Sequence, residues 1–118
     1  MSMRLSIVAM ISIAVAACGE LTVYETPYAQ GTVIDASNGR PIAAALIAVK
    51  TRADVTVVTS ASGEFVLSSA SHRASSFLPW DTYPPAGAIV VSARGYEQQE
   101  VGLRGGINDV TIRLVPKQ

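Results

Sequence analysis

Hydrophobic and polar positions follow two different patterns along the chain. Residues 5–17 form an apolar run that only Ser6 and Ser12 interrupt. From residue 29 onward, apolar residues instead alternate with polar ones in short segments that end at glycine, proline, asparagine or serine. Such alternation is typical of strands with one buried face, and no long window of this part shows the 3.6-residue period of an amphipathic helix. The pattern therefore predicts an apolar N-terminal helix followed by an all-β domain.

Seven segments of the domain are predicted strands, because each is rich in β-branched or aromatic residues and is bounded by turn residues. In the last of them, Val110, Ile112 and Leu114 are expected to face inward, and Phe65 and Leu67 share one face of the fourth. Seven short strands at this spacing predict a seven-stranded antiparallel β-sandwich of two sheets, of the immunoglobulin-like kind. The segments are residues 31–35, 44–50, 54–59, 64–67, 88–93, 96–103 and 110–114.

The apolar run at the N-terminus has the layout of a secretory signal peptide. A positive charge, Arg4, precedes 13 residues that are almost all apolar. A transmembrane helix needs about 20 such residues to cross the hydrocarbon core. Residues 1–17 are therefore predicted to be a signal peptide that is removed on export.

The end of this run resembles the lipobox of bacterial lipoproteins, an aliphatic residue and two small residues followed by cysteine, here Val15-Ala16-Ala17-Cys18. The resemblance implies cleavage between Ala17 and Cys18 and attachment of diacylglycerol to the Cys18 thiol. Because residue 19 is glycine rather than aspartate, it also implies the outer membrane, facing the periplasm. The alternative is that Cys18 is an incidental small residue that closes an ordinary signal. Lipidation accounts for a lone thiol that has no disulfide partner in the chain.

Between the lipobox and the domain, residues 18–28 are expected to form a short lipidated tether. Fully extended, such a segment reaches about 35 to 40 Å. The domain would then stay close to the membrane surface. Alternatively, residues 22–24 form an extra edge strand, which would shorten the tether.

The domain resembles a second family, the carboxypeptidase regulatory-like domain, over residues 29–116. This resemblance implies a transthyretin-like β-sandwich without catalytic groups of its own. Two positions depart from the family pattern: Ala44 stands where glycine is usual, and Ser60 stands where aspartate commonly follows a threonine. The matching positions are Gly31, Val33, Asp35, Gly39, Pro41, Ile42, Ala45, Ile47, Val49, Thr59, Gly63, Phe65, Leu67, Gly95, Tyr96, Val110, Ile112 and Leu114.

Composition excludes several classes of function. The chain has nine basic and nine acidic residues, which argues against nucleic acid as a partner, since that partner requires a basic excess. It has one histidine and one cysteine, whereas catalytic zinc commonly takes three protein ligands, mostly His and Glu. The sequence contains neither a Gly-x-Ser-x-Gly motif nor a glycine-rich phosphate loop. We therefore predict no enzymatic activity, no metal and no cofactor apart from the covalent lipid on Cys18.

One segment, residues 69–86, is not explained by the predicted sandwich. Loops longer than about 12 to 15 residues are uncommon in compact domains and are often functional. Trp80, Tyr83, His72 and Phe77 lie in this segment and form a candidate binding loop for a sugar ring or a protein partner. In the alternative, Phe77 and Trp80 fold back and plug an open end of the sandwich.

Together these observations predict a lipoprotein of the cell envelope, held to the membrane lipid through Cys18. Its sandwich is expected to be a non-catalytic structural or protein-interaction module with an envelope protein as partner. The alternative is a carbohydrate-binding module that binds glycan through the aromatic loop 69–86.

Overall fold

The computed structural model describes residues 21–74 and 83–118. The described residues are all-β and contain no helix, which confirms the predicted fold class. The expected signal helix, the cleavage site at Ala17 and Cys18, and the loop residues Phe77 and Trp80 lie outside the described residues.

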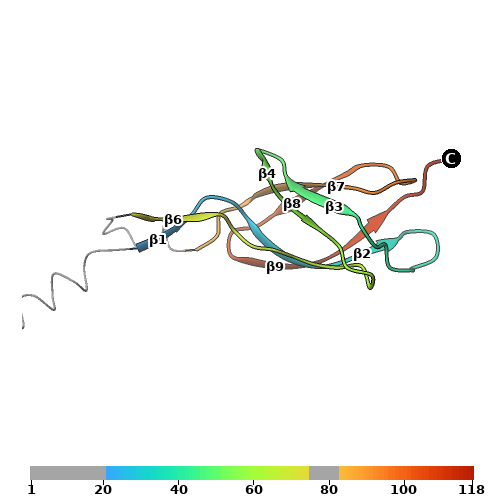
Figure 1. Ribbon diagram of the computed structural model, residues 1–118, viewed down its shortest axis with the longest axis horizontal. Helices are drawn as coiled ribbons and strands as arrows, with labels where there is room; N and C mark the ends of the chain where they lie inside the picture. The colour runs from blue at the N-terminus through green and yellow to red at the C-terminus, as the bar shows by residue number, and fades with distance from the viewer. Residues whose placement is uncertain (1–20, 75–82) are drawn as a thin grey trace, which may run out of the picture.

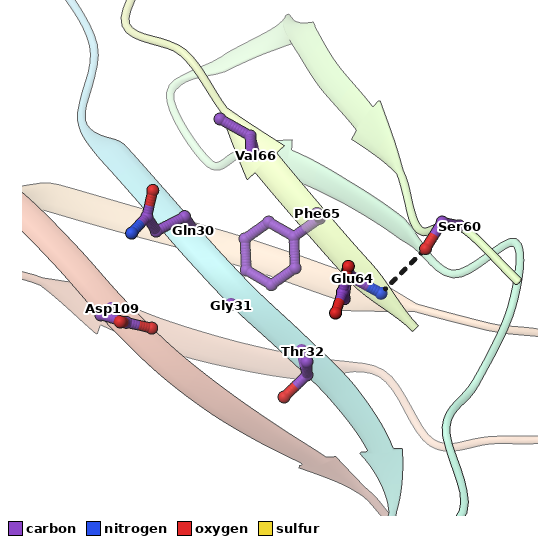
Figure 2. Close-up of a pocket in the computed structure, with 8 residues that line it drawn as sticks. All are labelled: Gln30, Gly31, Thr32, Ser60, Glu64, Phe65, Val66 and Asp109. Carbon is purple, nitrogen blue, oxygen red and sulfur yellow. Dashed lines mark hydrogen bonds between the residues drawn. The ribbon is translucent and has the colours of Figure 1, made fainter. Parts of the chain in front are cut away.

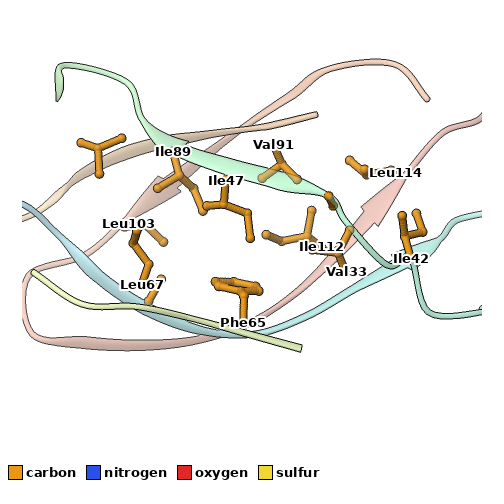
Figure 3. Close-up of a cluster of buried hydrophobic side chains, with 13 residues drawn as sticks. Val33, Ile42, Ile47, Phe65, Leu67, Ile89, Val91, Leu103, Ile112 and Leu114 are labelled. Atoms are coloured by element: carbon orange, nitrogen blue, oxygen red, sulfur yellow. The ribbon is translucent and has the colours of Figure 1, made fainter. Parts of the chain in front are cut away.

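Two sheets lie one over the other in a β-sandwich-like arrangement, and side chains fill the space between them (Figures 1 and 3). One sheet has three strands, in the order β5 (Glu64–Leu67), β2 (Tyr28–Asp35) and β9 (Ile107–Leu114). The other has four strands, in the order β4 (Arg52–Val58), β3 (Leu46–Val49), β7 (Gly87–Ser92) and β8 (Gln99–Leu103).

The strands of the three-stranded sheet are not all antiparallel, so that part of the prediction was wrong. β2 and β9 run parallel, from the pair Tyr28 and Ile107 to the pair Asp35 and Leu114. Alternation of apolar and polar residues indicates which face of a strand is buried, but it is the same in both chain directions. The direction of β9 follows instead from the connection after β8, which carries the chain from one sheet to the other.

A third, two-stranded sheet is formed by β1 (Leu21–Tyr24) and β6 (Ser71–Ala74). The two strands are antiparallel, with Leu21 opposite Ala74 and Tyr24 opposite Ser71. We call this sheet the ribbon; Figure 1 shows it projecting from one end of the sandwich, with the C-terminus at the other end.

The ribbon changes two expectations from the sequence. The alternative of an extra strand at residues 22–24 is confirmed, although its partner is β6 rather than an edge of the sandwich. The segment 69–86, in turn, contains strand β6 and is not irregular throughout. The described part of the chain thus has nine strands instead of seven, and the two additional strands, β1 and β6, pair only with each other.

The hydrophobic core lies between the two larger sheets (Figure 3). The inward positions of β5 and β9 are those predicted: Phe65, Leu67, Ile112 and Leu114 are at most 4% exposed, and Val110 is half-buried. Burial of one large apolar side chain contributes about 1.5 to 3 kcal/mol. The other core residues are Ala29, Val33, Ile42, Ala45, Ile47, Val49, Ile89, Val91 and Leu103.

Strand β8 begins later than predicted, at Gln99 rather than at Tyr96. The amide of Tyr96 donates to the carbonyl of Ala93 at 3.1 Å, which closes a turn in which Gly95 has a φ of 87°. Tyr96 then forms an isolated bridge with Pro116. Residues 96–98, the first of the predicted segment 96–103, therefore belong to this turn and its continuation rather than to β8.

Candidate functional site

The structure places two of the four predicted loop residues. His72 lies in β6, opposite Val23 of β1. Tyr83 lies just before β7 and is 56% exposed. His72 and Tyr83 lie on either side of residues 75–82. That segment contains Phe77 and Trp80 and lies outside the described residues. Whether the loop binds a partner or plugs the sandwich therefore remains a prediction.

A groove lies where the base of the ribbon meets the sandwich, and we call it the tyrosine groove. Its volume is about 350 Å³. It is lined by Tyr24, Tyr28, Ser68, Ser69, Pro84 and Ile107. These residues come from β1, from the starts of β2 and β9, and from the segments that precede β6 and β7, so the ribbon contributes one side of the groove through Tyr24.

Two hydrogen bonds close the base of the ribbon beside this groove. The amide of Glu25 donates to the carbonyl of Ala70 at 2.7 Å. The amide of Ala70 donates in turn to Thr26 Oγ1, also at 2.7 Å, and Thr26 is only 1% exposed. Because both bonds join the segment after β1 to the residue before β6, the base of the ribbon forms one defined wall of the tyrosine groove.

The opposite wall is positioned by Asn108, which is 6% exposed. Its Nδ2 donates to the carbonyl of Tyr28 at 3.0 Å and to that of Arg104 at 2.8 Å, while its Oδ1 accepts from the amide of Arg104 at 3.0 Å. The same side chain thus joins the turn before β9 to the start of β2. It sets the position of the neighbouring Ile107.

The tyrosine groove is uncharged and mainly apolar, with serine and tyrosine hydroxyls as its polar side-chain groups. None of its six lining side chains is acidic or basic. Ile107 is 74% exposed. This exposure is unfavourable, because apolar surface is more stable when it is removed from water. Ser69 Oγ is buried and has no hydrogen-bond partner in the structure, and Tyr28 donates its hydroxyl to Gln30 Oε1 at 3.1 Å. The groove suits a neutral or apolar surface better than an ionic ligand.

Several charged residues near the same end of the molecule are paired with one another. Arg52 bonds to Glu25 at 3.2 Å and to Asp54 at 3.0 Å. Lys50 bonds to Glu100 at 2.7 Å. The pair with Arg52 lowers the pKa of the Asp54 carboxyl, because the carboxylate accepts hydrogen bonds from the guanidinium. These groups come mainly from the four-stranded sheet and do not line the groove.

A second hollow lies on the outward face of the three-stranded sheet (Figure 2). It is shallow, with a volume of about 480 Å³. Gly31, which has no side chain, lies at its centre (Figure 2). At one margin, Ser60 Oγ accepts a hydrogen bond from the amide of Glu64 at 3.2 Å. Its other lining residues are Gln30, Thr32, Phe65, Val66 and Asp109. Within the described ranges, no three His, Cys, Asp or Glu side chains come together as a metal site.

The outward face of the four-stranded sheet has a different character. Since Ile47, Val91 and their neighbours point inward, the alternate residues point outward. Leu46 and Val58 are paired there and are 42% and 54% exposed. We call this surface the outer apolar face; its members are Leu46, Ala48, Thr56, Val58, Ala88, Val90, Ser92, Gly102 and, beside Val90, Glu100, which is paired with Lys50. A sheet face that meets only water normally carries polar residues.

The sequence did not indicate the tyrosine groove. Tyr24 and Tyr28 lie in the predicted tether, and Ile107 precedes the predicted last strand. The one available signal was the alternative strand at residues 22–24. That strand could not be placed without its partner β6.

No protein-family model and no curated protein matches the chain. Over residues 21–74 and 83–118, no helix is present that could cross a membrane.

Proposed function

We propose that the protein is a lipoprotein anchored in a membrane of the cell envelope, whose sandwich is a non-catalytic interaction module. The proposed anchor is diacylglycerol on Cys18, with the outer membrane as the proposed location. The observation that carries the proposal is the sequence Val15-Ala16-Ala17-Cys18, placed directly after an apolar run of signal-peptide length.

The ribbon supports this proposal by giving the anchor a defined attachment. β1 begins at Leu21, three residues after Cys18. Three residues span at most about 11 Å when fully extended. A domain attached in this way would be held near the bilayer by a paired ribbon rather than by an eleven-residue flexible tether.

Two positions with unusual backbone geometry, Ala44 and Gly31, support assignment to the carboxypeptidase regulatory-like family. Ala44 has a φ of 59°, a conformation that favours glycine, and it stands where that family usually has glycine. Gly31 has a φ of 154°, and a Cβ there would lie 1.7 Å from the carbonyl oxygen of Val110. Both positions are therefore constrained by backbone geometry rather than by chemistry at a site.

The outer apolar face supports the role of an interaction module. The paired Leu46 and Val58 expose large apolar surface on a sheet that is otherwise covered on its inner side. Exposed apolar patches commonly mark surfaces that bind another protein. The outward face of the three-stranded sheet serves as an internal comparison, because around the exposed Val66 it carries mainly polar residues, namely Gln30, Thr32, Glu64, Asp109 and Thr111.

The anchor is tested by growing cells that express the full chain with an alkyne-labelled fatty acid. We expect label on the wild-type protein and none on Cys18→Ala. Cys18→Ser is the matched control for the size of the side chain and should also take none. Label on either variant, or none on wild type, would contradict the proposal.

The interaction surface is tested in the same cells by placing a photoreactive amino acid at position 58 of the otherwise wild-type chain. Position 111 is the matched control, since Thr111 is exposed on the opposite outward face. We expect a discrete cross-linked protein from position 58 and none from position 111. Equal cross-linking from both positions would show that the outer apolar face is not a specific surface.

A second candidate function is carbohydrate binding, which the exposed Tyr83 beside the tyrosine groove favours. Tyrosine rings stack readily on sugar rings through their apolar faces. Titration with neutral oligosaccharides, followed by the fluorescence of Trp80, the single tryptophan, tests this candidate. A saturable change that Tyr83→Ala removes would support it, and no change across a broad glycan panel would exclude it.

A further inference from the structure

We propose that the tyrosine groove and Tyr83 form a membrane-facing surface that lies against the headgroup region of the bilayer. The inference rests on the proposed lipid anchor at Cys18 and adds the orientation of the sandwich. It commits to the lipid surface as occupant of the groove, with a protein or a glycan as outcomes that would overturn it.

The position of the groove along the chain limits its distance from the anchor. Tyr24 lines the groove and lies six residues after Cys18. Six extended residues span at most about 22 Å. Glu25 bonds to Arg52 of β4 at 3.2 Å, and Thr26 is 1% exposed. The segment that joins Tyr24 to the sandwich is therefore held in place, and the groove cannot move away from the anchor independently of it. The end of the sandwich that carries the groove is therefore the end held near the membrane.

The side chains at this end match the chemistry of a bilayer interface. Tyrosine is enriched at the level of lipid headgroups, where its ring is apolar and its hydroxyl remains hydrated. Three tyrosines, Tyr24, Tyr28 and Tyr83, lie at the groove or beside it, together with the exposed Ile107 and with Pro84. No lining side chain is ionic, so contact with lipid would leave no charge to desolvate.

The exposure of Ile107 is the strongest sign that this surface is covered. At 74%, it is the most exposed of the large hydrophobic residues in the described part of the chain. Its backbone is nevertheless fixed, because Ile107 pairs with Tyr28 and precedes the buried Asn108. A fixed and exposed isoleucine beside three tyrosines is the arrangement expected of a surface that meets lipid rather than water.

The test uses the full chain, purified from membranes with its anchor, and a thiol-reactive dye whose emission depends on polarity. Lipidation consumes the Cys18 thiol, so Ile107→Cys would introduce the single reactive thiol. Val115→Cys is the matched control, because Val115 is 51% exposed and follows β9 at the opposite end of that strand. Both proteins are placed in vesicles of phosphatidylethanolamine and phosphatidylglycerol that contain spin-labelled lipid as a quencher.

We expect the dye at position 107 to emit at shorter wavelength and to be quenched at least twofold more strongly than the dye at position 115. A dye at Tyr83→Cys should behave like the dye at position 107. Because Tyr83 lies outside the strands, this variant controls for a local effect of the substitution in β9. Equal quenching at positions 107 and 115 overturns the inference. A blue-shifted but unquenched dye at position 107 also overturns it, since another occupant would then cover the groove.

The wild-type chain separates failure of this inference from failure of the anchor. If Cys18 is lipidated, wild-type protein takes up no dye. Dye on wild type would show a free Cys18 thiol and would overturn the anchor together with the orientation. Dye-free wild type with equal quenching at the two positions would overturn the orientation alone.

Discussion

The hydroxyl of Tyr96 donates a hydrogen bond to Oδ2 of Asp35 at 2.6 Å, across 61 residues of sequence. Asp35 ends β2, and its other oxygen, Oδ1, accepts from the amide of Ser37 at 2.7 Å and from the Ser37 hydroxyl. The carboxylate therefore joins the turn after β2 to the turn before β8. This contact closes the end of the sandwich that lies away from the ribbon.

The hydrogen bonds to Asp35 predict a loss of stability in acid. The bonds from the Ser37 and Tyr96 side chains, and then that from the Ser37 amide, lower the pKa of Asp35 from 3.8 to about 2. A carboxyl whose pKa is lower in the folded state stabilises the fold above its ordinary pKa. That contribution is lost as the pH falls from about 4 to about 2.

The variant Asp35→Asn should unfold at a lower temperature than wild type at pH 7 and should show a weaker fall in stability between pH 4 and pH 2. Thermal unfolding followed by circular dichroism measures both quantities. Asp109→Asn, at an exposed position, is the control and should keep the wild-type response. An unchanged acid response in Asp35→Asn would refute the assignment.

Thr59 predicts the effect of removing one buried hydroxyl. Thr59 Oγ1 accepts from the amide of Ala45 at 2.9 Å and donates to the carbonyl of Ile42 at 2.7 Å. Thr59→Val keeps the shape but leaves the buried amide of Ala45 without a partner. We expect a loss of about 1 to 3 kcal/mol in the free energy of unfolding. Urea denaturation measures it, and Thr56→Val, at an exposed outward position, should change it little.

Ala44 predicts a substitution that stabilises the protein. Its φ of 59° strains an alanine, and its side chain is exposed, so glycine would lose no buried surface. Glycine relieves the strain of the left-handed backbone, but it also has more conformational freedom in the unfolded chain. The net gain in the free energy of unfolding should be about 0.5 to 1 kcal/mol. Urea denaturation of Ala44→Gly measures the gain. The neighbouring exposed Ala43→Gly is the control, and a gain of equal size there would count against the explanation.

Gly31 predicts the most damaging small substitution. A methyl group at this position would lie 1.7 Å from the carbonyl oxygen of Val110, within the parallel pairing of β2 and β9. Gly31→Ala should therefore separate these strands and cost about 4 kcal/mol or more. Gly102→Ala is the control, because no atom lies within 4 Å of the Cβ position there. Similar stability of the two variants would contradict the close approach of β2 and β9.

The sequence predicted the core better than the connections. Alternation placed Phe65, Leu67, Ile112 and Leu114 on buried faces, since a two-residue period depends only on which face of a strand meets the core. It could not give the direction of β9 beside β2, because alternation carries no direction.

The candidate site could be predicted only in part, for a similar reason. Tyr83 was identified by its residue type and its place in a long loop. Tyr24 and Ile107 were not, because only the pairing of β1 with β6 and the bonds of Asn108 bring them to one groove. Both effects join parts of the chain that are far apart in sequence.

The measurement that tests the account most directly is the mass of the mature N-terminal peptide from protein purified out of membranes. We predict a peptide that begins at Cys18 and carries diacylglycerol, with a further acyl chain on its amino group. A peptide that begins at another residue, or one that begins at Cys18 with a free thiol, would contradict the account.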